Sequence, residues 1–426
     1  MDKQLAEKYI RVLNEELIAA LGCTEPIALA YAGAIVRKEI GAMPDEITAL
    51  CSGNIIKNVK GVTVPNSGGR KGIETAVILG VIGGVAEKKL EVLTEIKQEH
   101  IDEMVKLKDA GYCSVELAEG VANLYICITA KHGNDIVKVE ILDKHTNIIN
   151  LEKNGVQVQG ITGAFDHGET TKVRDFMTVS DILDFAEIVE IKRIEKAIES
   201  QIECNTKIAY EGVEKKYGVN YGKNLLQIYG NDVKIRARAM AASGSDARMC
   251  GSDLAVVINS GSGNQGLTVS LPVIEYAKEL GCTKEKLYRA LVISNLIALH
   301  IKSGIGSLSA FCGAVGAAAG SSAAITWLKG GIKSQVENAI SNTLAIVSGI
   351  ICDGAKASCA AKISTSVEAA IMSSELAINE NNFSGGEGIV MDDIEDTIHN
   401  IGRLGKDGMK ETDIEILNMM IGRKTG

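Results

Sequence analysis

An uncharged stretch of 26 residues, from Ser303 to Leu328, sets the first limit on how this chain can fold. A helix of that length could cross a bilayer. However, Gly, Ala and Ser occupy 17 of its positions, so few large apolar side chains remain to gain from contact with lipid. The stretch therefore predicts a buried, tightly packed helix that begins in a Gly/Ser-rich loop, and no membrane span.

Helical spacing dominates the chain on both sides of a shorter region with a different pattern. In residues 113–152 apolar and polar residues alternate over four segments separated by turn residues, as is typical of strands, and a fifth strand is expected at 46–52. We predict an α+β fold, with a helical body formed by residues 1–110 and 200–426. A small α/β insert at 111–199 would include an exposed loop at 162–171 and a helix from about residue 180.

Charge and composition exclude one class of partner and suggest a compartment. The formal net charge is −9 and aromatic residues make up 4% of the chain, which argues against a nucleic-acid partner. The N-terminus shows no basic segment followed by an apolar one, so we expect a cytoplasmic protein. Disulfides are rare in that compartment. Metal binding, catalysis or burial must then account for the ten cysteines.

Three of these cysteines lie where one site could join them. Cys312 is expected at the start of the small-residue helix, and Cys352 and Cys359 lie in ICDGAKASCAAK. In a continuous helix the last two thiols would share a face about 10 Å apart, and a break at Asp353–Gly354 would bring them closer. Three thiolates could hold an iron–sulfur cluster and leave one iron open to substrate. The alternative is three core cysteines.

A fourth cysteine lies beside a predicted helix start, in GCTEPIALAYA at 22–32. With Thr24 as the N-cap, the helix dipole would lower the pKa of the Cys23 thiol. The charge of Glu25 would work against this effect. The alternative is that Cys23 is a small buried hydrophobic residue.

Two polar, Gly-rich segments, SGSDARMCGSD at 243–253 and NSGSGNQG at 259–266, are predicted to be loops. The second precedes a helix, and backbone N–H groups in such a loop could bind a substrate carboxylate. The alternative for both is a plain linker. The histidines show no metal-binding spacing, so His145 and His300 are expected to be structural or to support other residues.

From about residue 10 to 420 the sequence resembles the L-cysteine desulfidases, which are relatives of the iron–sulfur L-serine dehydratase α chain. The strings that carry the resemblance are, in order, GCTEPIALA, GVTVPNSGG, HTNII, SGSDARM, NSGSGNQG, ICDGAKASCAAKIST and GGEGIV. The resemblance implies a serine dehydratase-like fold, a homodimer, and a 4Fe–4S enzyme that degrades L-cysteine to pyruvate, ammonia and sulfide. It implies Cys312, Cys352 and Cys359 as cluster ligands and Cys23 as the acid or base. Arg70, Lys71 and Cys250 depart from the family pattern, in which these positions are smaller or less charged.

The expected chemistry is an elimination in which the substrate sulfur binds the open iron and a base, for which the Cys23 thiolate is the candidate, removes the Cα proton. The residues expected to bind substrate are Ser262, Asn264 and Gln265, followed by Thr24, Asn66, Ser67 and Arg248. Three other functions are compatible with the sequence. They are an iron–sulfur L-serine dehydratase, a non-catalytic sensor protein that carries a cluster, and a membrane channel built on 303–328.

Overall fold

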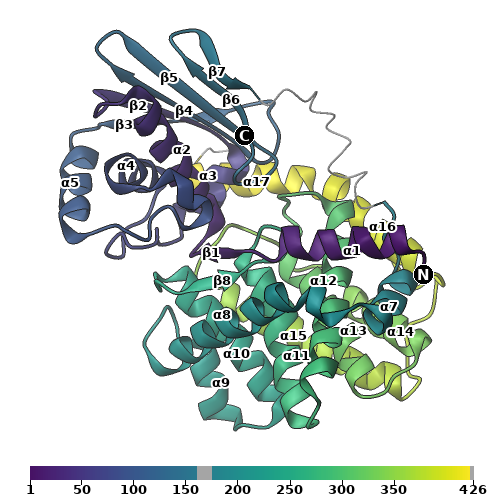
Figure 1. The fold of residues 1–426 in the computed structure, drawn as a ribbon. Coiled ribbons are helices and arrows are strands. Elements are labelled where there is room, and N and C mark those ends of the chain that lie inside the picture. Colours follow the sequence, from purple (N-terminus) through teal and green to yellow (C-terminus); the bar gives the residue numbers. More distant parts are fainter. Residues whose placement is uncertain (161–174, 423–426) are drawn as a thin grey trace.

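The computed structural model of the chain describes residues 1–160 and 175–422 and contains two lobes (Figure 1). The loop predicted at 162–171 lies outside the described residues. The sheet lobe consists of α2 (Thr24–Ile40), β2 (Glu46–Ser52), α3 (Gly53–Lys60), α4 (Ile73–Gly83), the 3-10 helix η1 (Ala86–Glu91), α5 (Gln98–Asp109), β3 (Cys113–Ala118), β4 (Tyr125–His132), β5 (Asp135–Leu142), β6 (Ile148–Lys153) and β7 (Val156–Gly160).

The helical body contains the remaining elements, which come from both ends of the chain. They are α1 (Lys3–Glu16), β1 (Ala19–Leu21), α7 (Val179–Ile188), η2 (Ile191–Arg193), α8 (Glu195–Glu214), α9 (Tyr221–Tyr229), α10 (Val233–Met249), β8 (Ala255–Val257), α11 (Gly263–Glu279), α12 (Lys284–Ile305), α13 (Gly313–Leu328), α14 (Lys333–Val347), α15 (Cys359–Ile378), α16 (Ile394–Arg403), the π-helical turn η3 (Leu404–Gly408) and α17 (Lys410–Ile421).

The six-stranded sheet has the order β3-β2-β4-β5-β6-β7. Strands β2 and β3 are parallel, and the other neighbours are antiparallel. Helices α2 and α4 pack together with their backbones in contact, because a Cβ on Gly80 would lie 2.1 Å from the carbonyl oxygen of Ala30. The predicted α+β class and the strand at 46–52 are confirmed.

The predicted division of the chain into body and insert does not follow this architecture. Strand β2 lies between β3 and β4, so the sheet lobe begins well before residue 111. Helix α7 packs against α12 of the helical body, so the sheet lobe also ends before residue 179. Alternation predicts that β2 is a strand, but only its pairing with strands more than 60 residues later shows which lobe it joins.

The small-residue stretch forms the end of α12, a loop and the buried helix α13. Gly320 of α13 lies against α12, since a Cβ on this residue would be 2.3 Å from the carbonyl oxygen of Ser294. The predicted buried helix after a Gly/Ser-rich loop is therefore confirmed. Among the described residues, no helix is both long and apolar enough to cross a membrane.

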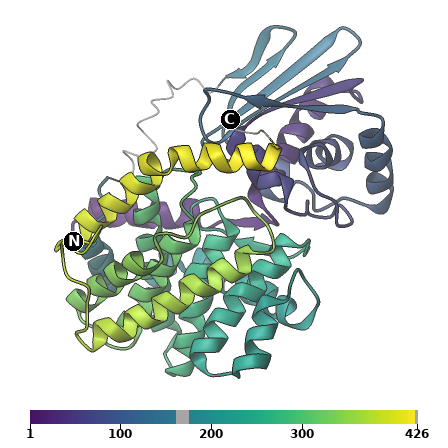
Figure 2. The same cartoon turned by 180° about the vertical axis from the view of Figure 1, so that it is seen from behind.

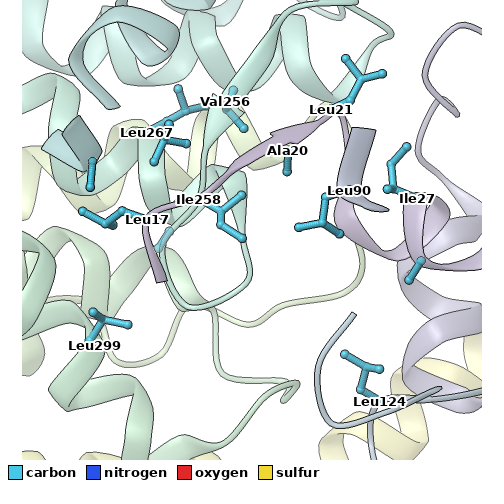
Figure 3. Close-up of a cluster of buried hydrophobic side chains, with 14 of the residues drawn as sticks. Leu17, Ala20, Leu21, Ile27, Leu90, Leu124, Val256, Ile258, Leu267 and Leu299 are labelled. Carbon is cyan, nitrogen blue, oxygen red and sulfur yellow. The ribbon is translucent and has the colours of Figure 1, made fainter. Parts of the chain in front are cut away.

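The two lobes share a hydrophobic junction around β1, which pairs antiparallel with β8. In Figure 3 Leu17, Ala20 and Leu21 lie at the centre of this junction, with Ile27 from the sheet lobe and Ile258 from the helical body close by. At the other end of the chain, α16 and α17 (yellow in Figure 2) run from the helical body to the sheet lobe, where α17 packs on α3. The junction around β1 and the α16–α17 segment join the two lobes, and both lobes contribute residues to the candidate site.

Candidate active site

A cavity of about 110 Å³ brings together side chains from both lobes. It is lined by Cys23, Glu25, Asn58, His145, Arg248, Ser260, Gly261, Ser262, Asn264, Gln265, Lys302, Ser307, Leu308, Ser309, Phe311, Cys312, Gly313, Ala314, Cys352, Gly354, Ala355, Cys359, Lys362 and Ile363. All four cysteines singled out in the sequence are among these residues, although they come from three separate segments of the chain.

Local backbone structure places the three thiols of Cys312, Cys352 and Cys359. The segments that carry Cys312 and Cys352 run side by side, with the N–H of Cys312 bonded to Ile350 O at 3.1 Å and the N–H of Cys352 to Ala310 O at 2.6 Å. Cys312 caps α13, and Cys359 is the first residue of α15. A non-helical turn separates Cys352 from Cys359, which is the second of the two arrangements open from the sequence, so the two thiols do not lie along one helix face.

The three thiols line one cavity but are not grouped tightly enough to share a single metal ion. Across residues 1–160 and 175–422 no three His, Cys, Asp or Glu side chains are close enough to share one ion. An iron–sulfur cluster is wider, and each of its iron atoms takes one thiolate, so its ligands can lie farther apart. Burial, together with the thiols of Cys352 and Cys359, raises the pKa of Cys312 to about 12. Thiols must lose their protons to bind a metal centre, and the positive charge of a bound centre would favour that loss here.

Positive side chains surround the three thiols. Lys302 on α12 is 8% exposed, and its burial lowers its pKa to about 8, against the opposing effect of Cys352 and Cys312. Lys362 donates to Ile351 O at 2.8 Å and pairs with Asp353. These ammonium groups would compensate the negative charge of a thiolate-bound cluster. The residues present therefore fit the 4Fe–4S group that the sequence implies.

The start of α2 carries a buried carboxylate on the cavity wall. Glu25 accepts hydrogen bonds from Cys23 Sγ at 3.0 Å through one oxygen and from Asn58 Nδ2 at 3.0 Å through the other. Burial alone would raise the pKa of Glu25, but His145, the Cys23 hydrogen bond and Arg248 outweigh it and keep the pKa below its usual range. Glu25 is therefore an ionised group facing the cavity.

The expected lowering of the Cys23 pKa is wrong. Burial and the neighbouring Glu25 carboxylate raise the pKa of this thiol well above its usual value, and Arg248 offsets only part of the effect. Cys23 itself occupies the N-cap position of α2, so Thr24 is not the N-cap. Cys23 therefore lies at the helix start as a protonated thiol that donates to Glu25.

The N-terminus of α11 supplies the polar wall that the sequence predicted at 259–266. Ser262 caps this helix, and Asn264 and Gln265 in its first turn line the cavity. Arg248, 2% exposed, donates through Nε to Gly22 O at 2.8 Å and passes beside Gly263, where a Cβ would lie 2.3 Å from its Nε. A helix N-terminus next to a buried guanidinium is a suitable place for a carboxylate.

Three buried polar atoms of the cavity wall are available to a ligand. Asn58 Oδ1, His145 Nε2 and Asn264 Oδ1 are buried without a hydrogen-bond partner, and all three residues line the cavity. Buried polar groups in proteins almost always find a partner. A zwitterionic ligand in the cavity would supply donors and acceptors to such groups.

His145 is the main site residue that sequence reasoning missed. It lies in the turn between β5 and β6, and a Cβ on Gly261 would lie 3.2 Å from its ring. Burial lowers the pKa of His145, and Arg248 adds to this effect while Glu25 opposes it. His145 begins the string HTNII, which contributes to the resemblance and is the one sequence signal that points to this residue. Glu25, Asn58, Lys302 and Lys362 were also missed.

Three predicted substrate-binding residues do not line the cavity. Thr24 Oγ1 lies 2.9 Å from Gly261 O and so joins the two lobes. Asn66 donates to Leu93 O, and Ser67 bonds with the backbone of Arg70. Their segment supports the site from behind, because a Cβ on Gly22 would lie 2.2 Å from Pro65.

The loop predicted at 243–253 is largely helical. Residues up to Met249 form the last turns of α10, and only the following residues leave the helix. Serine and glycine favour loops in isolation, but here they allow close packing. A Cβ on Gly244 would lie 2.9 Å from Leu267 of α11. This packing places Arg248, in the final turn, beside the cavity.

A second cavity of about 490 Å³ adjoins the first. The two cavities share His145, Ser260, Gly261, Lys302 and Ser307. The outer part of the larger cavity is lined by α1 residues such as Arg11 and Glu15 and by Lys144. The two cavities are therefore neighbours separated by a common wall.

Comparison with known proteins agrees with this architecture. The serine dehydratase alpha chain family matches residues 87–418. A UPF0597 protein of Lachnoclostridium phytofermentans is 52% identical over 97% of this chain and 99% of its own length. UPF0597 proteins of Desulfitobacterium hafniense and Treponema denticola are 51% and 47% identical, over 98% and 99% of this chain and 97% and 99% of their own lengths. The chain therefore belongs to the serine dehydratase alpha chain family.

Proposed function

We propose that the protein is a lyase that eliminates sulfide from L-cysteine to give pyruvate and ammonia, using a 4Fe–4S cluster held by Cys312, Cys352 and Cys359. The observation that carries this proposal is the single cavity that joins those three thiols to an ionised carboxylate and a helix N-terminus. As part of the same proposal the enzyme is a cytoplasmic homodimer, although no step below depends on a second copy.

The two charged groups of an amino acid have matching partners in the cavity. The substrate carboxylate would bind at the N-terminus of α11, between Asn264, Gln265 and Arg248. The substrate ammonium would bind Glu25, whose carboxylate Asn58 holds in place at 3.0 Å. Fixing both groups leaves the side chain directed at the three thiols and orients the Cα–H bond.

We assign the proton transfer from Cα to His145 Nε2, which is buried, partnerless and part of the cavity wall. The proton moves to His145 while the Cα–H electron pair forms the double bond and the C–S electron pair leaves with the sulfur. When bound, the cluster supplies a Lewis acid that stabilises the departing sulfide. The aminoacrylate product tautomerises and reacts with water to give pyruvate and ammonia.

Cys23 has a different role in this scheme from the base expected of it. Because its thiol donates to Glu25 at 3.0 Å, Cys23 orients the carboxylate that receives the substrate ammonium. Although Cys23 is not the base in this scheme, we expect it to be essential. If its thiol were removed, Glu25 would lose one of its hydrogen-bond donors.

Anaerobically purified, iron-loaded protein tests the proposal. We expect sulfide release from L-cysteine to exceed pyruvate release from L-serine in kcat/KM. The family match favours an L-serine dehydratase as the second candidate, and faster turnover of serine would establish that function instead. Iron-loaded protein that binds either amino acid but forms no product would indicate a sensor.

A further inference from the structure

Helix α3 contains a buried lysine whose partners lie in the C-terminal helix and in the segment of Cys352. Lys57 is 1% exposed. Its Nζ forms an ion pair with Asp413 of α17 and lies 3.4 Å from the carbonyl oxygen of Cys352. A buried ammonium is stable only when its donors are satisfied. Lys57 therefore ties α17 to the backbone of a proposed cluster ligand.

The contact between α17 and α3 extends beyond this ion pair. Asn54 Nδ2 donates to the second oxygen of Asp413 at 2.6 Å. A Cβ on Gly53 would lie 2.4 Å from a methyl carbon of Leu417, so the two helices are in close contact. Figure 2 shows α17 reaching from the helical body to the sheet lobe at this point. Asp413 therefore has one carboxylate oxygen paired with Lys57 and the other bonded to Asn54.

The Cys352 segment is closely fitted to the other side of α3. Gly354 has a φ of +96°, and a Cβ there would lie 2.5 Å from the carbonyl oxygen of Lys57. A Cβ on Gly61 would lie 3.2 Å from Ala355 O. The next residue of α3, Asn58, holds Glu25. One short helix therefore contacts both the thiol side and the carboxylate side of the cavity.

We propose that α17 is a clamp for the thiol of Cys352. Asp413 holds the ammonium of Lys57, Lys57 holds the carbonyl of Cys352, and the C-terminal helix thereby fixes one sulfur relative to the other two. Lys57 and Asp413 are positioning residues, because neither lines the cavity. The clamp is a property of the chain alone, while its effect on iron retention rests on the proposed function.

The double variant Lys57→Met/Asp413→Leu tests the clamp. It replaces the ion pair by apolar side chains of similar size, a change that is often neutral for stability, but it leaves Cys352 O without its donor and Asn54 Nδ2 without its acceptor. We expect amide hydrogen exchange in residues 350–358 to become at least about threefold faster relative to exchange in the rest of the protein. Residues 98–109 of α5 serve as the internal reference.

Two further variants separate the clamp from general loosening. Leu417→Ala opens the contact of α17 with Gly53 without touching the charges, and we expect faster exchange in 350–358 here too. Lys60→Met removes an exposed contact between the same helices, to Met420 O, and should leave that peptide unchanged. Normal exchange at 350–358 in both the double variant and Leu417→Ala would overturn the clamp.

Iron release gives a second readout in the loaded protein. We expect the double variant to lose iron to a chelator several-fold faster than the wild type, while Lys60→Met matches the wild type. Iron release at the wild-type rate, despite faster exchange, would show that the clamp does not extend to the cluster. A wild-type protein that takes up no iron would contradict the proposed cofactor, and the exchange comparison would still decide the clamp.

Discussion

Replacing single cysteines should divide the four cavity thiols into two classes. We expect Cys312→Ala, Cys352→Ala and Cys359→Ala to lose most of their iron, because each removes one proposed ligand. Cys23→Ala should keep its iron and lose turnover. Iron and acid-labile sulfide analysis after anaerobic reconstitution measures the difference. Cys204→Ala, on α8 and outside the cavity, is the control. Loss of iron in Cys23→Ala would make Cys23 a ligand.

His145 should determine the acid limb of the pH profile. Burial lowers the pKa of His145 and Arg248 adds to the effect, while Glu25 opposes it. The ring is then neutral at pH 7 and able to accept a proton, and kcat/KM should fall only below the ordinary histidine value of about 6.5. A pH–rate profile of iron-loaded protein measures this limb.

Removing the imidazole gives the corresponding mutational test. We expect His145→Gln to lower kcat by a factor of about 100 or more, as is usual for loss of a general base, with iron content unchanged. His399→Gln changes an exposed histidine of α16 and should behave like the wild type. A near-normal kcat in His145→Gln would show that another residue is the general base.

At the level of single residues, the sequence identified which side chains could react or bind a ligand. It did not show how those side chains are buried or which groups lie beside them. The four cysteines and the start of α11 were found from motifs and helix-start signals. The raised pKa of Cys23 was not, because it depends on burial and on the distance to Glu25, which the sequence does not contain. His145 was missed for the same reason, since no local pattern shows that its turn faces a cavity formed mainly by another lobe.

Among the elements, close helix packing at glycines should dominate stability. Gly320→Ala would place a Cβ 2.3 Å from Ser294 O and force α13 away from α12. We expect a loss of about 1–3 kcal/mol in the free energy of unfolding, measured by denaturant titration. Gly349→Ala is the matched control, because a Cβ there meets nothing within 4 Å. Equal stability of the two variants would show that α12 and α13 can separate at little cost.

Elements were predictable where their signal is local. Alternation predicted strands near residues 46–52 and 113–152, and the small-residue stretch predicted a buried helix; the structure confirms both. The segment 243–249 was predicted as a loop because Ser and Gly disfavour isolated helices, but close packing against α11 outweighs that preference. The family relationship is confirmed as well, while L-cysteine as substrate stays a prediction.

For the whole molecule, ligand binding should depend on both lobes at once. L-Alanine carries the ammonium and carboxylate but no leaving group, so it should bind without reacting. At 100 times its dissociation constant it should stabilise the protein by about 2.7 kcal/mol, measured as a rise in the unfolding midpoint. Glu25→Gln in the sheet lobe and Arg248→Met in the helical body should each reduce the rise.

Fragments of the ligand provide the controls for this experiment. Propionate lacks the ammonium, so Glu25→Gln should not alter any shift that propionate produces. Ethylamine lacks the carboxylate, so Arg248→Met should not alter any shift in the unfolding midpoint that ethylamine produces. A rise with L-alanine that survives both substitutions would show that the amino acid binds elsewhere.

The arrangement of lobes could not be read from the sequence. Strand β2 joins strands that follow much later, and β1 pairs with β8 across more than 230 residues. Such pairings depend on long-range contacts rather than on local preference, which is why the predicted boundaries at residues 110 and 200 do not match the lobes.

The cavity shared by the two lobes also bears on the order of events during folding. Cys23 belongs to the sheet lobe, whereas Cys312, Cys352 and Cys359 belong to the helical body. A folding intermediate whose lobes have not yet docked would present these walls separately. A small molecule bound there would therefore be enclosed only after docking, so its binding and the docking of the lobes should be thermodynamically coupled.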